Sequence, residues 1–136
     1  MASPNRRFVT AREANTESFE GRVNSWLCRP DLVAADKLQL CRASLPPGQG
    51  HNFHRHPDLE EIIYVLEGEV EQWVEREKQV LKPGEVAHIP ANIVHATFNV
   101  GKGTATILAI LSPGAPAGPF LVDMSGEEPW KSLRQG

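Results

Sequence analysis

The stretch GQGHNFHRHPDLEEIIYVLEG, residues 48–68, decides the fold of this 136-residue chain. Its first half contains three histidines, and its second half is an apolar run that opens with Glu60 and Glu61. Carboxylates beside residues that favour burial need an explanation, because a buried ionised carboxylate without a strong partner is costly. Either the histidines belong to a solvated loop, or several of these side chains share one ion.

His54 and His56 have the spacing of two side chains on one face of a β-strand. Residues i and i+2 point to the same side, with Cα atoms about 6.6 Å apart. Two imidazoles at this offset can bind one ion at about 2.0–2.1 Å. Glu60 and Glu61 then open the next strand and face opposite sides, so one of them starts a row directed into the interior. A cation held by neutral imidazoles would be the partner that this carboxylate requires.

The remainder of the chain has the pattern of short β-strands. Runs rich in β-branched and aromatic residues, such as 60–68, 69–77 and 104–114, alternate with Gly and Pro. No window of eleven or more residues keeps a 3.6-residue apolar period. Many short strands at near-even spacing predict an all-β fold, either a sandwich or a small barrel.

Composition excludes several function classes. Fourteen basic and seventeen acidic residues give a net charge of −3 without a basic cluster, which argues against nucleic-acid binding. No apolar run approaches the roughly 20 residues that span a membrane, and the N-terminus lacks the apolar core of a secretory signal. We therefore expect a cytoplasmic protein. Cys28 and Cys41 match no zinc-binding spacing, and we expect both to be buried free thiols.

The opening stretch resembles the first signature motif of the cupin superfamily. That motif is a Gly, five residues, His-x-His, three or four residues, a Glu, six residues and a Gly. Every position of it is filled here, by Gly48, His54, His56, Glu61 and Gly68. The register of the motif selects Glu61 over Glu60 as the inward carboxylate.

A second stretch, GEVAHIPANIVHATFN, resembles the companion cupin motif of Gly, five residues, Pro-x-Gly, two residues, His, three residues and Asn. Gly84, Pro90, His95 and Asn99 fill their positions. The one departure is Asn92, where the family has Gly. Because Asn tolerates a left-handed backbone better than most residues, we expect the turn before His95 to be retained.

The resemblance implies a jelly-roll-like β-barrel with one divalent transition metal per chain. Its ligands would be His54, His56, Glu61 and His95, and ligand type alone does not choose among Mn, Fe, Ni, Co, Cu and Zn. The alternative is that the four side chains only form hydrogen bonds, as in cupins that have lost their metal. Such cupins have usually lost ligands too, whereas this chain retains all four.

The domain organisation predicted from this resemblance is one barrel with two extensions. Residues 1–21 form a polar N-terminal arm, residues 22–113 form the barrel, and residues 114–136 form a tail that packs on or near it. Phe120 and Trp130 are apolar anchors for the tail. Small cupins commonly pair, so we expect a homodimer.

Three functions are compatible with such a site. The leading hypothesis is a dioxygenase-type oxidoreductase that resembles the quercetin dioxygenase-like cupins and acts on a small organic molecule. The second is a non-redox isomerase, epimerase or lyase that acts on a sugar or keto acid and uses the metal as a Lewis acid. The third is a module that binds a metal and a small ligand without catalysis.

Four further side chains are candidates with weaker support. His88 lies close to the site in the cupin pattern and could act as a general acid or base, or it could face outward. Gln72 could contact a substrate or be solvated, and Phe98 could line the pocket or belong to the core. His51 lies three residues before His54, with the opposite strand parity, and we expect it to be a loop residue.

Overall fold

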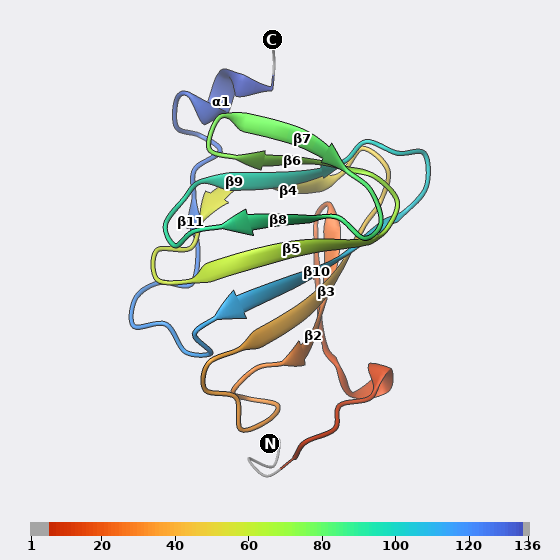
Figure 1. Ribbon diagram of the computed structural model, residues 1–136, viewed down its shortest axis with the longest axis vertical. Coiled ribbons are helices and arrows are strands. Elements are labelled where there is room, and N and C mark those ends of the chain that lie inside the picture. The colour runs from red at the N-terminus through yellow and green to blue at the C-terminus, as the bar shows by residue number, and fades with distance from the viewer. Residues whose placement is uncertain (1–5, 135–136) are drawn as a thin grey trace.

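The computed structural model describes residues 6–134, and within them the chain forms two antiparallel β-sheets that face each other (Figure 1). The six-stranded sheet has the order β1-β2-β3-β10-β5-β8, and the five-stranded sheet has the order β11-β4-β9-β6-β7. This arrangement confirms the predicted all-β, cupin-type architecture. The elements are η1 (Ala11–Glu13), β1 (Asn15–Phe19), β2 (Arg22–Cys28), β3 (Gln39–Leu45), β4 (Gly50–Arg55), β5 (Glu60–Glu67), β6 (Val70–Val74), β7 (Glu77–Leu81), β8 (Val86–Ile89), β9 (His95–Asn99), β10 (Ala105–Ser112), β11 (Val122–Asp123) and α1 (Trp130–Leu133).

The main core lies between the two sheets and follows from strand alternation. In β5, Glu61, Ile63 and Val65 are buried, while the residues between them face outward. Side chains with period 2 on each strand therefore supply one inner face, and the opposing sheet covers it. The buried residues of this core are Ala43, Leu45, Ile63, Val65, Val70, Leu81, Ile89, Ala105 and Ile107.

Two turn positions of the cupin motifs have a backbone that explains their residue type. Gly68 has φ 80°, and a Cβ atom there would lie 2.9 Å from the Cα atom of Ala105. Asn92 has φ 69°, which confirms that Asn supplies the left-handed turn in place of Gly. Its side-chain oxygen also accepts a hydrogen bond from Arg55 at 2.7 Å.

The N-terminal segment contains a strand that the sequence did not indicate. Residues 15–19, which lie within the expected polar arm, form β1 and pair antiparallel with β2. Every residue of β1 is exposed, so the strand lacks the apolar alternation by which strands are recognised. It is an edge strand that is held by its backbone hydrogen bonds.

The C-terminal tail covers the outer face of the five-stranded sheet. β11 pairs with β4, and Met124, Trp130 and Leu133 pack on an apolar cluster of that face. The buried members of the cluster are Phe53, Trp73, Val94, Ala96 and Phe98. Both faces of this sheet are thus covered, which explains why all five residues of β9 are buried. No helix in residues 6–134 is long and apolar enough to span a membrane.

Substitution of two neighbouring isoleucines tests the alternation of buried and exposed side chains along β5. Ile63 is 3% exposed in the core, whereas Ile62 is 37% exposed on the opposite face. We expect Ile63→Ala to lower the free energy of unfolding by about 2–5 kcal/mol, because it leaves a cavity. The matched control Ile62→Ala should cost less than about 1 kcal/mol. Urea denaturation of both variants measures this difference, and equal losses would contradict the assignment of faces.

Candidate metal centre

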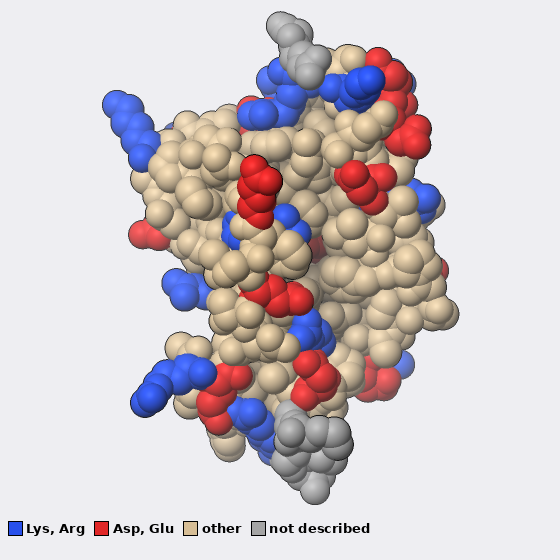
Figure 2. Space-filling view, turned by 180° about the vertical axis from the view of Figure 1, so that it is seen from behind, with Lys and Arg blue, Asp and Glu red and all other residues tan. Residues whose placement is uncertain are grey.

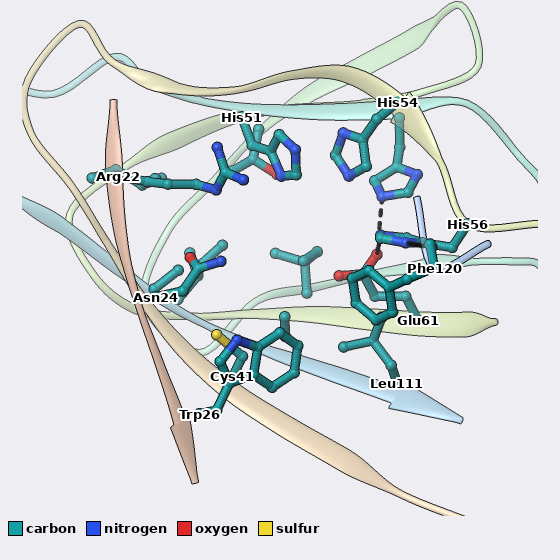
Figure 3. Close-up of a pocket in the computed structure, with 17 residues that line it drawn as sticks. Arg22, Asn24, Trp26, Cys41, His51, His54, His56, Glu61, Leu111 and Phe120 are labelled. Carbon is teal, nitrogen blue, oxygen red and sulfur yellow. Dashed lines mark hydrogen bonds and ion pairs between the residues drawn. The ribbon is translucent and has the colours of Figure 1, made fainter. Parts of the chain in front are cut away.

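A cavity of about 60 Å³ lies between the two sheets (Figure 3). One end of it is lined by His54, His56, Glu61 and His95, and the other end is lined by residues of β2. A cavity of this volume accommodates only a few water molecules or the end of a small organic molecule.

Two consecutive strands, β4 and β5, and the more distant β9 bring the four predicted ligands together. His54 belongs to β4 and is the cross-strand neighbour of His95, the first residue of β9. His56 directly follows β4, and Glu61 is the second residue of β5. All four are at least 95% buried. The nearest ring nitrogens of the three histidines lie within 4.8 Å of one another.

Each of the three imidazoles is oriented by a hydrogen bond from Nδ1 to a backbone carbonyl. The acceptors are Asn52 at 2.6 Å for His54, Phe120 at 2.7 Å for His56, and Ile93 at 2.9 Å for His95. Since a carbonyl oxygen only accepts, each Nδ1 carries the proton and each Nε2 presents a lone pair in the neutral ring. An outward N–H to a carbonyl is the usual second contact of a metal-binding histidine.

The carboxylate of Glu61 is the fourth member of the candidate site, and its surroundings indicate that a positive charge belongs between it and the histidines. Its Oε1 atom lies 2.9 Å from Nε2 of His95 and 3.4 Å from Nε2 of His56. Within the described residues, Oε1 and the Nε2 atom of His95 are both buried without a hydrogen-bond partner. Two lone pairs that face each other at this distance repel unless a positive charge lies beside them. The donor set therefore fits a divalent cation of the kind that imidazole and carboxylate bind together.

The pKa values of Glu61, His54 and His56 are shifted because these groups are buried next to one another. Burial alone would raise the pKa of Glu61, but His56 and His95 outweigh it and lower that pKa to about 2. Burial, followed by the neighbouring histidines, holds the pKa of His54 well below its ordinary value. Burial also acts to lower the pKa of His56, but Glu61 outweighs it, so that this pKa is raised. The carboxylate is thus anionic, and a proton on His56 would compete with a metal bound there.

His51 lies in the cavity, and our expectation that it is a loop residue is wrong. It belongs to β4, and its ring stacks on that of His54 with centroids 3.5 Å apart. The register with β9 shifts between these two histidines, so β4 contains one extra residue. This bulge reverses the strand parity and turns both rings to the same side. Burial, with a smaller contribution from Arg22, lowers the pKa of His51 to about 3.

Three other candidates, for which the sequence left a position inside or outside the pocket open, lie away from the cavity. His88 is on the outer face of the six-stranded sheet, half-exposed, with Nε2 2.5 Å from the Glu60 carboxylate. Gln72 is buried behind the cavity wall, where it accepts a hydrogen bond from Thr97 at 2.6 Å. Phe98 packs under the C-terminal tail on the outer face of the other sheet. Strand parity places His88 and Phe98 outside, since their neighbours Ile89 and Thr97 face inward.

Several lining residues were missed by sequence reasoning. Arg22, Asn24 and Trp26 alternate along β2 and all face the cavity, which their i, i+2, i+4 spacing could have indicated. Phe120 of the tail packs on the His56 ring at 4.9 Å between centroids. Cys41 is also part of the wall, and burial raises the pKa of its thiol to about 12. Because reactive cysteines are thiolates, Cys41 has a structural role here.

The fold and the motifs agree with comparisons to known proteins, and the chain belongs to the cupin family. The family model described as the cupin domain matches residues 41–111. This confirms the resemblance on which the ligand assignment rests.

Three similar proteins show how far the likeness extends. Polyketide synthase CurC of Streptomyces cyaneus is 32% identical over 90% of this chain and 79% of its own length. The solved structure of the polyketide cyclase RemF of Streptomyces resistomycificus has a TM-score of 0.71 at 23% identity, covering 95% of this chain and 93% of RemF. Quercetin 2,3-dioxygenase of Bacillus subtilis is 32% identical over 51% of this chain but only 20% of the enzyme.

Substitution of single histidines tests the metal site. His56→Ala removes one of the three clustered nitrogens, and we expect most of the bound metal to be lost. His51→Ala removes a ring outside that cluster, and His88→Ala removes an exposed ring, so both variants should retain near-parental metal content. Elemental analysis of protein purified without a metal-affinity tag measures this. Equal metal content in all three variants would contradict the assignment.

The raised pKa of His56 also predicts a pH dependence. As the pH falls through this pKa, the imidazole takes up a proton and can no longer bind a metal. We therefore expect metal affinity to increase from about pH 6 to pH 8, by at most about tenfold per pH unit for each proton released. Competition with a chelator at constant ionic strength measures it. An affinity that stays constant or falls over this range would refute the prediction.

Proposed function

We propose that this cupin is a metal-dependent enzyme that performs redox-neutral chemistry at a carbonyl group of a small organic molecule. The observation that carries the proposal is the convergence of three Nε2 lone pairs and one carboxylate at the end of a cavity. A cation bound among the four side chains would neutralise the carboxylate and accept the lone pairs, and the cavity beside them has room for the reacting part of a substrate.

In the proposed reaction, the protein positions the metal ion and limits the access of water to the cavity. His54, His56, His95 and Glu61 would hold the ion, and the carbonyls that accept from Nδ1 keep the rings from turning. A divalent ion bound there would supply a Lewis acid that polarises a carbonyl oxygen. The apolar walls on both sides, including Ile63, keep bulk water from competing for the same positions.

The similarity to CurC favours redox-neutral chemistry. That relative is named a polyketide synthase and aligns over nearly the whole of this chain. A polyketide carries carbonyl groups on alternate carbons, and closing a ring within it requires no oxidant. One C–H proton is removed, a C–C bond forms to a carbonyl carbon, and that carbonyl oxygen takes up a proton. A cavity of about 60 Å³ would receive the reacting end of such a molecule, not all of it.

A dioxygenase is the second candidate function. It is favoured by the 32% identity to quercetin 2,3-dioxygenase and by the ligand set, which also suits redox-active ions. The likeness covers only half of this chain, which is why we place it second. The expected homodimer and the cytoplasmic location stay predictions.

One experiment separates the candidates. Protein with measured metal content is incubated with a small 1,3,5-tricarbonyl compound or with a flavonol, and oxygen uptake and products are followed together. We expect ring closure of the tricarbonyl compound with loss of water and without oxygen uptake, and the rate should fall at least about 100-fold in Glu61→Gln. His88→Ala is the matched control and should retain the parental rate.

The other outcomes reject the leading proposal in different ways. Oxygen uptake with the flavonol in proportion to metal content would establish the dioxygenase instead. Full metal content with tight binding of either compound, and no turnover, would identify a binding module.

A further inference from the structure

The end of the cavity opposite His56 and Glu61 is built by β2, and the His51 ring lies beside Arg22 there (Figure 3). Arg22, Asn24 and Trp26 project from one face of this strand into the cavity, across from His56 and Glu61 (Figure 3). Val23, between the first two, is exposed on the other face. All of these residues precede the family match at residues 41–111.

Arg22 has an unsatisfied donor. Its Nε atom is buried and has no hydrogen-bond partner within residues 6–134. Burial lowers the pKa of the guanidinium, which nevertheless stays charged. A buried N–H without an acceptor costs free energy, and more so on a charged group. Such a group is expected where a ligand supplies the acceptor.

The position of the guanidinium is held by an aromatic ring. The Cζ atom of Arg22 lies 4.3 Å from the ring centroid of Phe19 in β1. A cation over a ring face is attracted to it, but this contact uses none of the N–H donors. The donors of Arg22 therefore stay available, and the side chain is oriented before any ligand arrives.

We propose that Arg22 and Asn24 form a subsite that binds a delocalised oxyanion of the substrate, either a carboxylate or an enolate. The planar guanidinium fork matches two oxygens that share one negative charge, and the Asn24 amide adds a further donor. The inference rests on the proposed function, because the substrate would extend from this subsite to the carbonyl at the histidine cluster. It makes the substrate an anionic or readily enolised carbonyl compound.

The charges lining the cavity agree with this class of ligand. The one acidic side chain in the cavity wall is Glu61, which lies at the histidine end, where a bound metal would neutralise it. Arg22 lies at the other end and forms no ion pair within residues 6–134, although the charge of Glu17 acts on it from outside the cavity wall. An anion between them therefore completes the charge balance, whereas a neutral or cationic ligand would leave the guanidinium unpaired.

Two probes separate the two sources of the oxyanion. Acetoacetate carries a carboxylate, and acetylacetone carries only an enolisable diketone. Their binding to the full-length, metal-analysed protein is measured by calorimetry for the parent, Arg22→Met, Asn24→Leu and the control Arg42→Met. Arg42 is an exposed arginine on the outer face of β3, so its replacement removes the same charge outside the cavity.

We expect Arg22→Met to weaken binding of at least one probe by about tenfold or more, and Asn24→Leu to weaken it less. Loss for acetoacetate alone assigns a carboxylate, and loss for both probes assigns the shared oxyanion. Arg42→Met should bind as the parent does. Parental affinity of Arg22→Met for both probes, or no binding of either probe to the parent, would overturn the proposal.

A thermal readout distinguishes a binding role from a structural one. If the role of Arg22 is to bind a ligand, the Arg22→Met variant without ligand should unfold at the same temperature as the parent or at a higher one. The reason is that the substitution removes a buried donor without a partner. If Arg22 served only to hold β1 through Phe19, the same change would lower the unfolding temperature and overturn the proposal. Arg22-dependent binding in protein that binds no metal would support the subsite while rejecting the proposed enzyme.

Discussion

The contact on which the site depends is the approach of the Glu61 carboxylate to the lone pairs of His56 and His95 in the protein interior. Hydrogen bonds from Nδ1 to backbone carbonyls hold these rings with Nε2 directed inward. Neither the carboxylate nor the rings can turn toward water, because the opposing sheet covers them. A cation at this point satisfies all the lone pairs together, and this requirement explains why polar residues occupy the centre of an apolar sandwich.

The two ends of the cavity have different origins. The histidine end comes from the strands that match the cupin domain. The opposite wall comes from β2, and the tail closes the space beside the histidines through Phe120, whose backbone oxygen also orients His56. On the face of the molecule shown in Figure 2, basic and acidic side chains are interspersed.

The four side chains of the candidate metal site could be predicted because they follow from short sequence motifs. His54, His56, Glu61 and His95 follow from motif spacing, and strand alternation turns that spacing into direction. The positions of other side chains did not follow from the sequence where a bulge reversed the strand alternation, or where a distant segment determined which face of a strand is covered. The bulge in β4 turns His51 inward, and the residue types of this segment do not indicate that the strand contains an extra residue. Phe98 faces the tail, and a single strand does not reveal which of its two faces borders a cavity.

The sequence by itself determined the β-sandwich, the positions of the four candidate ligands and the turn residues between them, since each follows from short-range alternation or from backbone preferences such as that of Asn92. The tertiary structure alone decided that β2 and the tail would enclose the same cavity as those ligands. Strand pairing between segments distant in the chain depends on closing long loops and on filling a shared interior. Pairing of distant strands and filling of the interior are properties of the folded molecule, so a short sequence pattern does not predict them.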